Sequence, residues 1–181
     1  MELMSYKTAV NEQGSAERLK TALAEKTIFK IKEGVYSKEK NPPESAVVCF
    51  EYPRAVITML SAFYHHGLTD SIPEKVDVAI PSSARAPHNA KIRVYYSPRG
   101  HHEPGVIIEE KHGYPIRVYC KERMLIELLR NKESMPYDLY KEVLSNYRRI
   151  VESLDLRLID DLLEGFPKAR LIQRRLMEEV L

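Results

Sequence analysis

The chain has 181 residues, of which 44% are hydrophobic and 30% are charged, and its formal net charge at pH 7 is +2. This length and apolar content are enough to bury a sizeable core, and they predict one domain or one domain with a small appendage. No run approaches the roughly 20 apolar residues of a membrane-spanning helix, and the N-terminus lacks a signal-peptide pattern, so we expect a cytoplasmic protein without membrane contact. Cys49 and Cys120 lie far apart and outside any C-x-x-C pattern, which predicts buried thiols rather than a zinc site or a disulfide framework.

The charges are distributed unevenly along the chain. Residues 1–41 hold 8 Lys and Arg against 6 Asp and Glu, and residues 85–123 hold 8 against 4. Residues 42–84, between them, hold only 2 against 5. Two basic regions separated by an acidic one are typical of a protein that binds a polyanion, although the same share of charged residues is also that of an ordinary solvated surface.

The N-terminal stretch predicts two short helices followed by a two-stranded hairpin. The first helix covers residues 6–12 and ends at Gly14, and Ser15 is a good N-cap for a second helix over SAERLKTALAEK. The alternation in TIFKIK predicts a strand, residues 33–34 a turn, and residues 35–36 a returning strand. This is the order of elements in a winged helix-turn-helix DNA-binding unit, here with the first of its usual three helices missing or reduced.

In that unit the second helix enters the major groove and the hairpin contacts phosphates. The predicted DNA-contacting residues lie on this helix and around the hairpin: Arg18, Lys20, Thr21, Lys26, Lys30, Lys32 and Lys38. The alternative is that lysines on a hairpin edge serve only to prevent strand aggregation. The Asn41-Pro42-Pro43 segment is a stiff polar break, so we place a domain boundary between residues 1–41 and residues 42–181.

The stretch from Tyr52 to Pro81 is the best-patterned part of the chain. Pro53 suits the first turn of a helix, and the apolar spacing predicts that this helix runs over residues 53–66 and ends at Gly67. Two strands are predicted over residues 76–80 and 91–96, with a loop between them. A later hairpin is predicted from strands over residues 106–110 and 116–120. Together they predict a small, mostly antiparallel sheet packed on the 53–66 helix.

The C-terminal third is predicted to be helical. Four apolar stripes with capping residues indicate helices over 122–130, 136–152, 155–165 and 167–180. Short loops between them predict a bundle or a cap against the sheet. The predicted fold class is therefore α+β, with a reduced N-terminal winged helix-turn-helix, a small sheet on a central helix, and a C-terminal helical bundle.

The chain has, in this order, Gly34-Val35-Tyr36 after a basic hairpin, then YPRAVITMLSAFYHHGLTDSIPEKVDVAIP, KIRVYY and YPIRVYCKERMLIELLR. This order of segments resembles the AbiEi family, the antitoxins of abortive-infection (type IV) toxin–antitoxin systems, which are also described as transcriptional regulators. The run Ser61-Ala62-Phe63-Tyr64 with Gly67-Leu68-Thr69-Asp70 and Pro73 resembles the central helix and turn of the family. Residues 116–130, which end the run YPIRVYCKERMLIELLR, resemble its second signature, and the KEVL segment with the helical tail fits the C-terminal part. The resemblance covers essentially the whole chain.

The resemblance implies a two-part protein. An N-terminal winged helix binds inverted repeats in the promoter of its own operon and represses it, and palindromic operators favour two copies on DNA. The domain over residues 42–181 neutralises a nucleotidyltransferase-like toxin, which in a type IV system does not require direct contact. No catalytic residue, metal or cofactor is carried over, so the expected protein is an antitoxin and autorepressor and not an enzyme. A second version is an antitoxin that has lost DNA binding.

The sequence leaves two other kinds of site to consider, a nuclease site and a metal site. Glu109 and Lys111 form an E-x-K pattern that, with Asp77 on a nearby strand, imitates a Mg²⁺-dependent nuclease, although the lysine falls in a predicted turn. All six histidines lie between residues 65 and 112. Adjacent histidines point to different faces of a helix or strand, so we predict helix-end and loop positions rather than a metal site.

The chain has eleven tyrosines and no tryptophan, which is a high tyrosine content for this length. The ordinary explanation is that these tyrosines belong to an amphipathic core. The functional alternative is an aromatic and arginine surface for RNA or a protein partner. Its candidate residues are Arg85, Arg93, Arg117, Arg123, Arg148 and Arg149.

Overall fold

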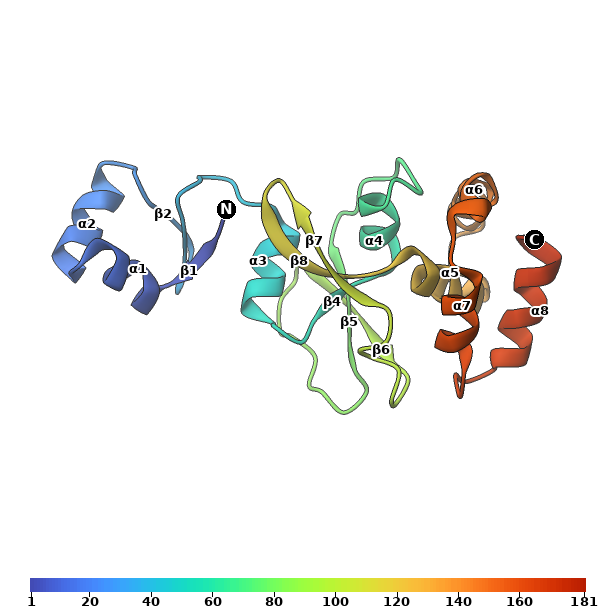
Figure 1. Ribbon diagram of the computed structural model, residues 1–181. Helices are drawn as coiled ribbons and strands as arrows, with labels where there is room; N and C mark the ends of the chain where they lie inside the picture. Colours follow the sequence, from blue (N-terminus) through green and yellow to red (C-terminus); the bar gives the residue numbers. More distant parts are fainter. The chain divides into compact units, whose positions relative to one another are not determined.

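The computed structural model describes residues 1–181, with eight α-helices and two β-sheets, and confirms the α+β class. The chain forms two compact units, which are coloured along the sequence in Figure 1: residues 1–53 with 108–116, and residues 54–107 with 117–181. The boundary predicted after residue 41 falls inside the first unit, which also holds the next helix. None of the helices combines the length and the apolar character needed to cross a membrane.

Residues 1–53 of the first unit contain three strands and three helices. Its elements are β1 (Leu3–Ser5), α1 (Tyr6–Gln13), α2 (Ala16–Ala24), β2 (Phe29–Lys32), β3 (Val35–Ser37) and α3 (Glu44–Glu51). The strand order is β1-β3-β2, with both pairings antiparallel. The two helices and the hairpin lie close to their predicted positions, whereas β1 and α3 were not predicted.

Local capping explains how α1 and α2 form on either side of a tight turn. The hydroxyl oxygen of Ser5 accepts the backbone N–H of Thr8, and that of Ser15 accepts the backbone N–H of Arg18. Gly14 ends α1 with a positive φ of 86°, which glycine adopts without strain. Each helix end therefore has a partner supplied by the sequence next to it.

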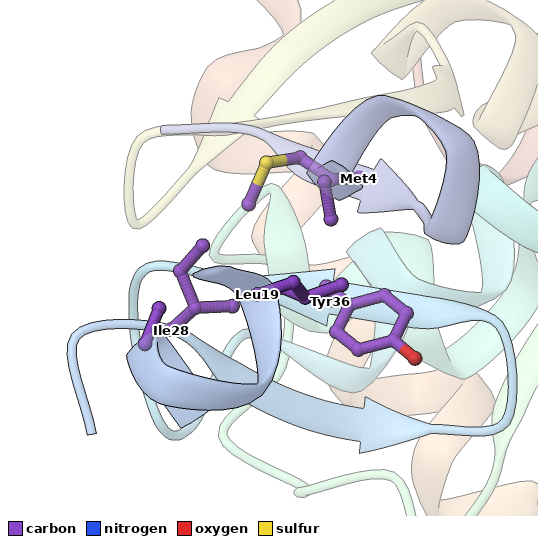
Figure 2. Packing of buried hydrophobic residues seen from close by; sticks show 6 residues of the cluster. Met4, Leu19, Ile28 and Tyr36 are labelled. Carbon is purple, nitrogen blue, oxygen red and sulfur yellow. The ribbon is translucent and has the colours of Figure 1, made fainter. Parts of the chain in front are cut away.

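The core of this unit joins both helices to the sheet. Six buried residues make it: Met4, Ala9, Leu19, Ala22, Ile28 and Tyr36. Figure 2 shows the labelled members of this cluster gathered from β1, α2, the segment before β2, and β3. Because each helix buries only one stripe here, its opposite face is left to solvent.

The second unit is built on a five-stranded sheet with the order β6-β5-β4-β8-β7. Its elements in chain order are β4 (Val56–Ile57), α4 (Met59–His65), β5 (Val76–Pro81), β6 (Ile92–Ser97), β7 (Val106–Lys111), β8 (Tyr114–Tyr119), α5 (Lys121–Arg130), α6 (Tyr137–Ile150), α7 (Leu156–Leu163) and α8 (Ala169–Glu179). The outer end of the β7–β8 hairpin, residues 108–116, belongs to the first unit, although its strands are part of this sheet.

The central helix predicted over residues 53–66 is wrong in its first half. Pro53 lies in a turn, Val56 and Ile57 form β4, and the helix begins at Met59. β-branched residues suit a strand, and both are fully buried between β5 and β8, so tertiary pairing overrides the helical spacing. The predicted end is confirmed, because α4 ends at His65 and Gly67, just after the C-cap residue His66, has a φ of 69°.

The sheet is mixed rather than mostly antiparallel, so that part of the prediction is also wrong. β4 pairs antiparallel with β5, but it pairs parallel with β8, and β5 pairs parallel with β6 from Val76 opposite Ile92 to Pro81 opposite Ser97. A loop of ten residues connects β5 to β6 as a crossover, which the alternation of the strands themselves does not reveal.

The predicted C-terminal helices are confirmed within a few residues of their ends. Asp155 caps α7 as expected, with Oδ1 accepting the backbone N–H groups of Arg157 and Leu158. The buried helix α5 packs on α4 and on each of α6, α7 and α8 (Figure 1). It is therefore the central helix of this unit.

Candidate nucleic-acid interface

Helix α2 presents Arg18, Lys20 and Thr21 to solvent, together with the acidic Glu17 of its first turn. Leu19 and Ala22 anchor its inner face in the core, so helical geometry directs Thr21 away from the core and places Arg18 and Lys20 on the two flanks of the outer face. All three of these outer residues are exposed. The Thr21 hydroxyl donates to the carbonyl of Glu17, one turn earlier, at 3.2 Å, which holds its side chain against the helix.

The cations of this helix carry no intramolecular partner. Arg18 and Lys20 form no ion pair, and neither does Lys26, which follows the helix in a left-handed conformation with φ of 59°. Unpaired exposed cations keep their full charge available to an anion from outside.

The lysines of the hairpin behave differently. Nζ of Lys30 lies 2.6 Å from Oε2 of Glu33, and Nζ of Lys32 lies 2.7 Å from Oε2 of Glu51. In each case the hydrogen bond to the carboxylate is the largest cause that raises the pKa of the lysine. The third hairpin candidate, Lys38, pairs with Glu12.

The structure therefore divides the seven predicted DNA-contacting residues into two groups. All seven are exposed. Arg18, Lys20 and Lys26 at α2 form no ion pair, and Thr21 hydrogen bonds to the carbonyl of Glu17. Lys30, Lys32 and Lys38 are each paired with a carboxylate. An exposed cation, Lys7 on α1, also has no ion pair, and the sequence analysis did not single it out.

Arg123 is not a surface residue, which corrects its prediction as a partner contact. It is 0% exposed, its Nη2 lies 2.9 Å from Oε1 of Glu127 one turn later, and its Nη1 donates to the carbonyl of Pro104. Its guanidinium also stacks over the rings of Tyr119 and Phe166, at 4.6 and 5.0 Å. These contacts make Arg123 a core residue.

The other predicted partner-contacting arginines are distributed over several elements. Arg85 is exposed in the loop after β5, and Arg93 on β6 has its Nε 3.8 Å from Oδ1 of Asp77. Arg117 donates to Glu103 at 2.7 Å. Arg148 and Arg149 are exposed neighbours in the last turn of α6. The structure does not bring these residues together into one arginine surface.

The residues of the nuclease alternative lie on strands that are not neighbours. Asp77 is on β5 and both Glu109 and Lys111 are on β7, with β4 and β8 between them in the sheet order. Asp77 is 1% exposed and neither of its carboxylate oxygens accepts a hydrogen bond. Burial raises its pKa to about 6, and the nearby Arg93 opposes this rise. The strand order does not favour a nuclease site.

Three histidines hydrogen bond to the main chain of the second unit. Nε2 of His66 lies 2.7 Å from the carbonyl oxygen of Tyr119, and Nε2 of His101 lies 3.1 Å from that of Gly165. His102 is 7% exposed, with Nε2 2.8 Å from the carbonyl of Arg54 and Nδ1 3.1 Å from Oγ of Ser97. Because a carbonyl only accepts, Nε2 of His102 carries the proton and Nδ1 accepts from Ser97.

A basic region in the second unit was missed by sequence reasoning as a site. From Val78 to His102 the chain has four Lys and Arg and no acidic residue. The absence of acidic residues from this run is visible in the sequence. The wider range 85–123 hides it, because that range includes four acidic residues.

The comparisons with known proteins bear on the fold. No family model matches the chain, and no curated protein matches it in sequence. The fold is similar to the crystal structure of the RV2827C protein from Mycobacterium tuberculosis, with a TM-score of 0.62 and 13% sequence identity over 96% of this chain and 72% of that chain. At this identity the likeness concerns the fold alone.

Proposed function

We propose that this chain is a DNA-binding autorepressor and an antitoxin of the AbiEi type, and that its first unit is a reduced winged helix-turn-helix. The observation that supports DNA binding best is that Arg18 and Lys20 on the exposed face of α2 form no ion pair. Helix α2 follows α1 across a tight turn and precedes a β-hairpin. The antitoxic half is supported by the resemblance of the sequence to that family.

The arrangement of α2 suggests how the two kinds of contact divide. In a major groove, Arg18 and Lys20 on the flanks of the helix face the phosphates of the two strands, while Thr21 between them faces the base edges. The hairpin lysines contribute less, since a phosphate must compete with Glu33 and Glu51 for them.

The test is binding of the chain to a duplex that contains an inverted repeat from the DNA upstream of its own gene. Fluorescence anisotropy over a salt series is expected to show tighter binding than to a scrambled duplex, with an affinity that falls steeply as salt rises. The double variant Arg18→Ala with Lys20→Ala is expected to bind at least about tenfold more weakly and to reduce the salt slope by about 2, because two phosphate contacts are lost.

Arg157→Ala is the matched control, since Arg157 is an exposed arginine of α7 without an ion pair and belongs to the other unit. Its binding curve is expected to equal that of the unaltered chain. Equal affinity of the unaltered chain for the operator and the scrambled duplex at low salt would contradict the regulator, and would leave an antitoxin that has lost DNA binding.

The antitoxic half is tested separately by co-expression. A neighbouring gene for a nucleotidyltransferase-like protein is expected to arrest growth alone and to permit growth when this chain is present. Continued growth arrest at matched expression of both proteins would contradict the antitoxin.

A further inference from the structure

A cavity of about 440 Å³ opens at one edge of the sheet in the second unit. It is lined by the residues that follow β5, namely Pro81, Ser82 and Ser83, and by those that follow β6, namely Pro98, Arg99, Gly100 and His102. β5 and β6 are parallel and in register up to Pro81 opposite Ser97, so both loops leave the sheet at its carboxyl edge. Ligands of parallel sheets bind at this edge, and the volume falls within the usual range for small-molecule sites.

The polar groups of this cavity are donors without internal acceptors. Ser82, Ser83 and Arg99 are exposed, and their side chains make no hydrogen bond or ion pair within the chain. A guanidinium beside two hydroxyls matches the oxygens of a phosphate, to which arginine donates in a fixed fork.

His102 forms a fixed wall of the cavity rather than a ligand. Both of its ring nitrogens are occupied by Ser97 and by the carbonyl of Arg54. Its own carbonyl accepts the Tyr119 hydroxyl at 2.9 Å. Burial is the largest cause that lowers the pKa of His102, so the ring is neutral near pH 7 and leaves the positive charge to the arginine.

The surrounding sequence favours an anion and disfavours a cation. The acid-free run from Val78 to His102 contains both loops of the cavity, and its Arg85 follows Ser83 closely. No carboxylate lines the cavity. With Arg99 as the charged residue of its lining, the cavity attracts anions rather than cations.

We propose that this cavity binds the phosphate group of a small molecule of nucleotide size, with Ser82, Ser83 and Arg99 as donors. The volume leaves room beyond the phosphate for an attached sugar or base. The site is independent of the DNA-binding proposal, because all of its residues belong to the second unit.

Isothermal titration of the full chain with inorganic phosphate, AMP and a short single-stranded oligonucleotide tests this proposal. Saturable binding of AMP and weaker binding of phosphate at the same site are expected. Arg99→Ala should weaken AMP binding about tenfold or more, which is the loss expected for a charge-assisted hydrogen bond. Ser82→Ala with Ser83→Ala should weaken it by a smaller factor, and Arg157→Ala should leave it unchanged.

Three outcomes would overturn the proposal. The first is no saturable binding of AMP or phosphate by the unaltered chain. The second is an equal loss in Arg99→Ala and Arg157→Ala, which would indicate general charge attraction. The third is binding of the oligonucleotide alone, which would assign the loops to a nucleic-acid backbone. Because the altered side chains are exposed, circular dichroism is expected to show unchanged folding in all variants.

Discussion

The two units of this chain differ in whether their charged residues are exposed or buried. No charged residue of the first unit is buried, and its buried residues are apolar side chains, two tyrosines and two serines. The second unit buries Asp77, Arg123 and Glu127 within its core. The unpaired cations of α2 in the first unit are therefore available to a partner, whereas these three residues of the second unit act on the stability of the fold.

Arg123→Ala tests the buried half of this contrast and has the largest expected effect. The substitution removes one of the two arginines that pair with the buried Glu127, the other being Arg130, and empties the space over two aromatic rings, so we expect a loss of about 3 kcal/mol in the free energy of unfolding. Urea denaturation followed by circular dichroism measures it. Arg157→Ala is the exposed control, with an expected change within about 0.5 kcal/mol. Similar midpoints for the two variants would contradict the structural role of Arg123.

Asp77→Asn tests whether a buried charge strains the second unit. The pKa of Asp77 in the folded chain, about 6, lies above its ordinary 3.8, so the folded chain holds a proton that the unfolded chain loses between these values. Stability contributed by this group is therefore lost as pH rises from about 4 to 6. The asparagine cannot titrate, so we expect the variant to gain up to roughly 3 kcal/mol relative to the unaltered chain across this window.

Thermal or urea unfolding of both proteins at about pH 4 and about pH 7 gives this difference. Comparing the two pH values removes the effect of the amide group itself, which is the same at both. A stability difference between the two proteins that does not change with pH would show that folding does not raise the pKa of Asp77.

Glu33→Gln with Glu51→Gln tests the surface half of the contrast and has the smallest expected effect. Releasing Lys30 and Lys32 from their carboxylates adds two available cations to the hairpin. If the hairpin contacts DNA, affinity for the operator duplex should rise a few-fold and the salt slope should steepen by up to about 2. The thermal midpoint should stay unchanged, because exposed ion pairs contribute little to stability. Unchanged affinity would place the hairpin away from DNA.

The parts of the fold that were predicted correctly are those with local signals. Gly14 and Ser15 fix the turn between α1 and α2, and Asp155 caps α7, because each acts on residues within one turn of itself. The strand β4 was missed because two residues carry no period, and only pairing with distant strands defines them. The same holds for β1, which has three residues.

The candidate sites follow the same division. The exposure of Arg18 and Lys20 could be predicted from the apolar stripe of one helix. The burial of Arg123 could not, because it depends on a bend 18 residues earlier, where Gly105 has a φ of 83° and an added Cβ would lie 2.6 Å from the Cβ of Arg123. The cavity next to Arg99 joins two loops across a parallel crossover, which no spacing within either loop indicates.

The position of β4 in the middle of its sheet has a consequence for the order in which the chain folds during synthesis. Ile57 pairs with Val118, so the sheet of the second unit stays open until residues well beyond 107 have left the ribosome. The three-stranded sheet of the first unit is complete by Ser37. Because distant pairings are slow to close, we expect α2 and its hairpin to form while the later strands are still being made.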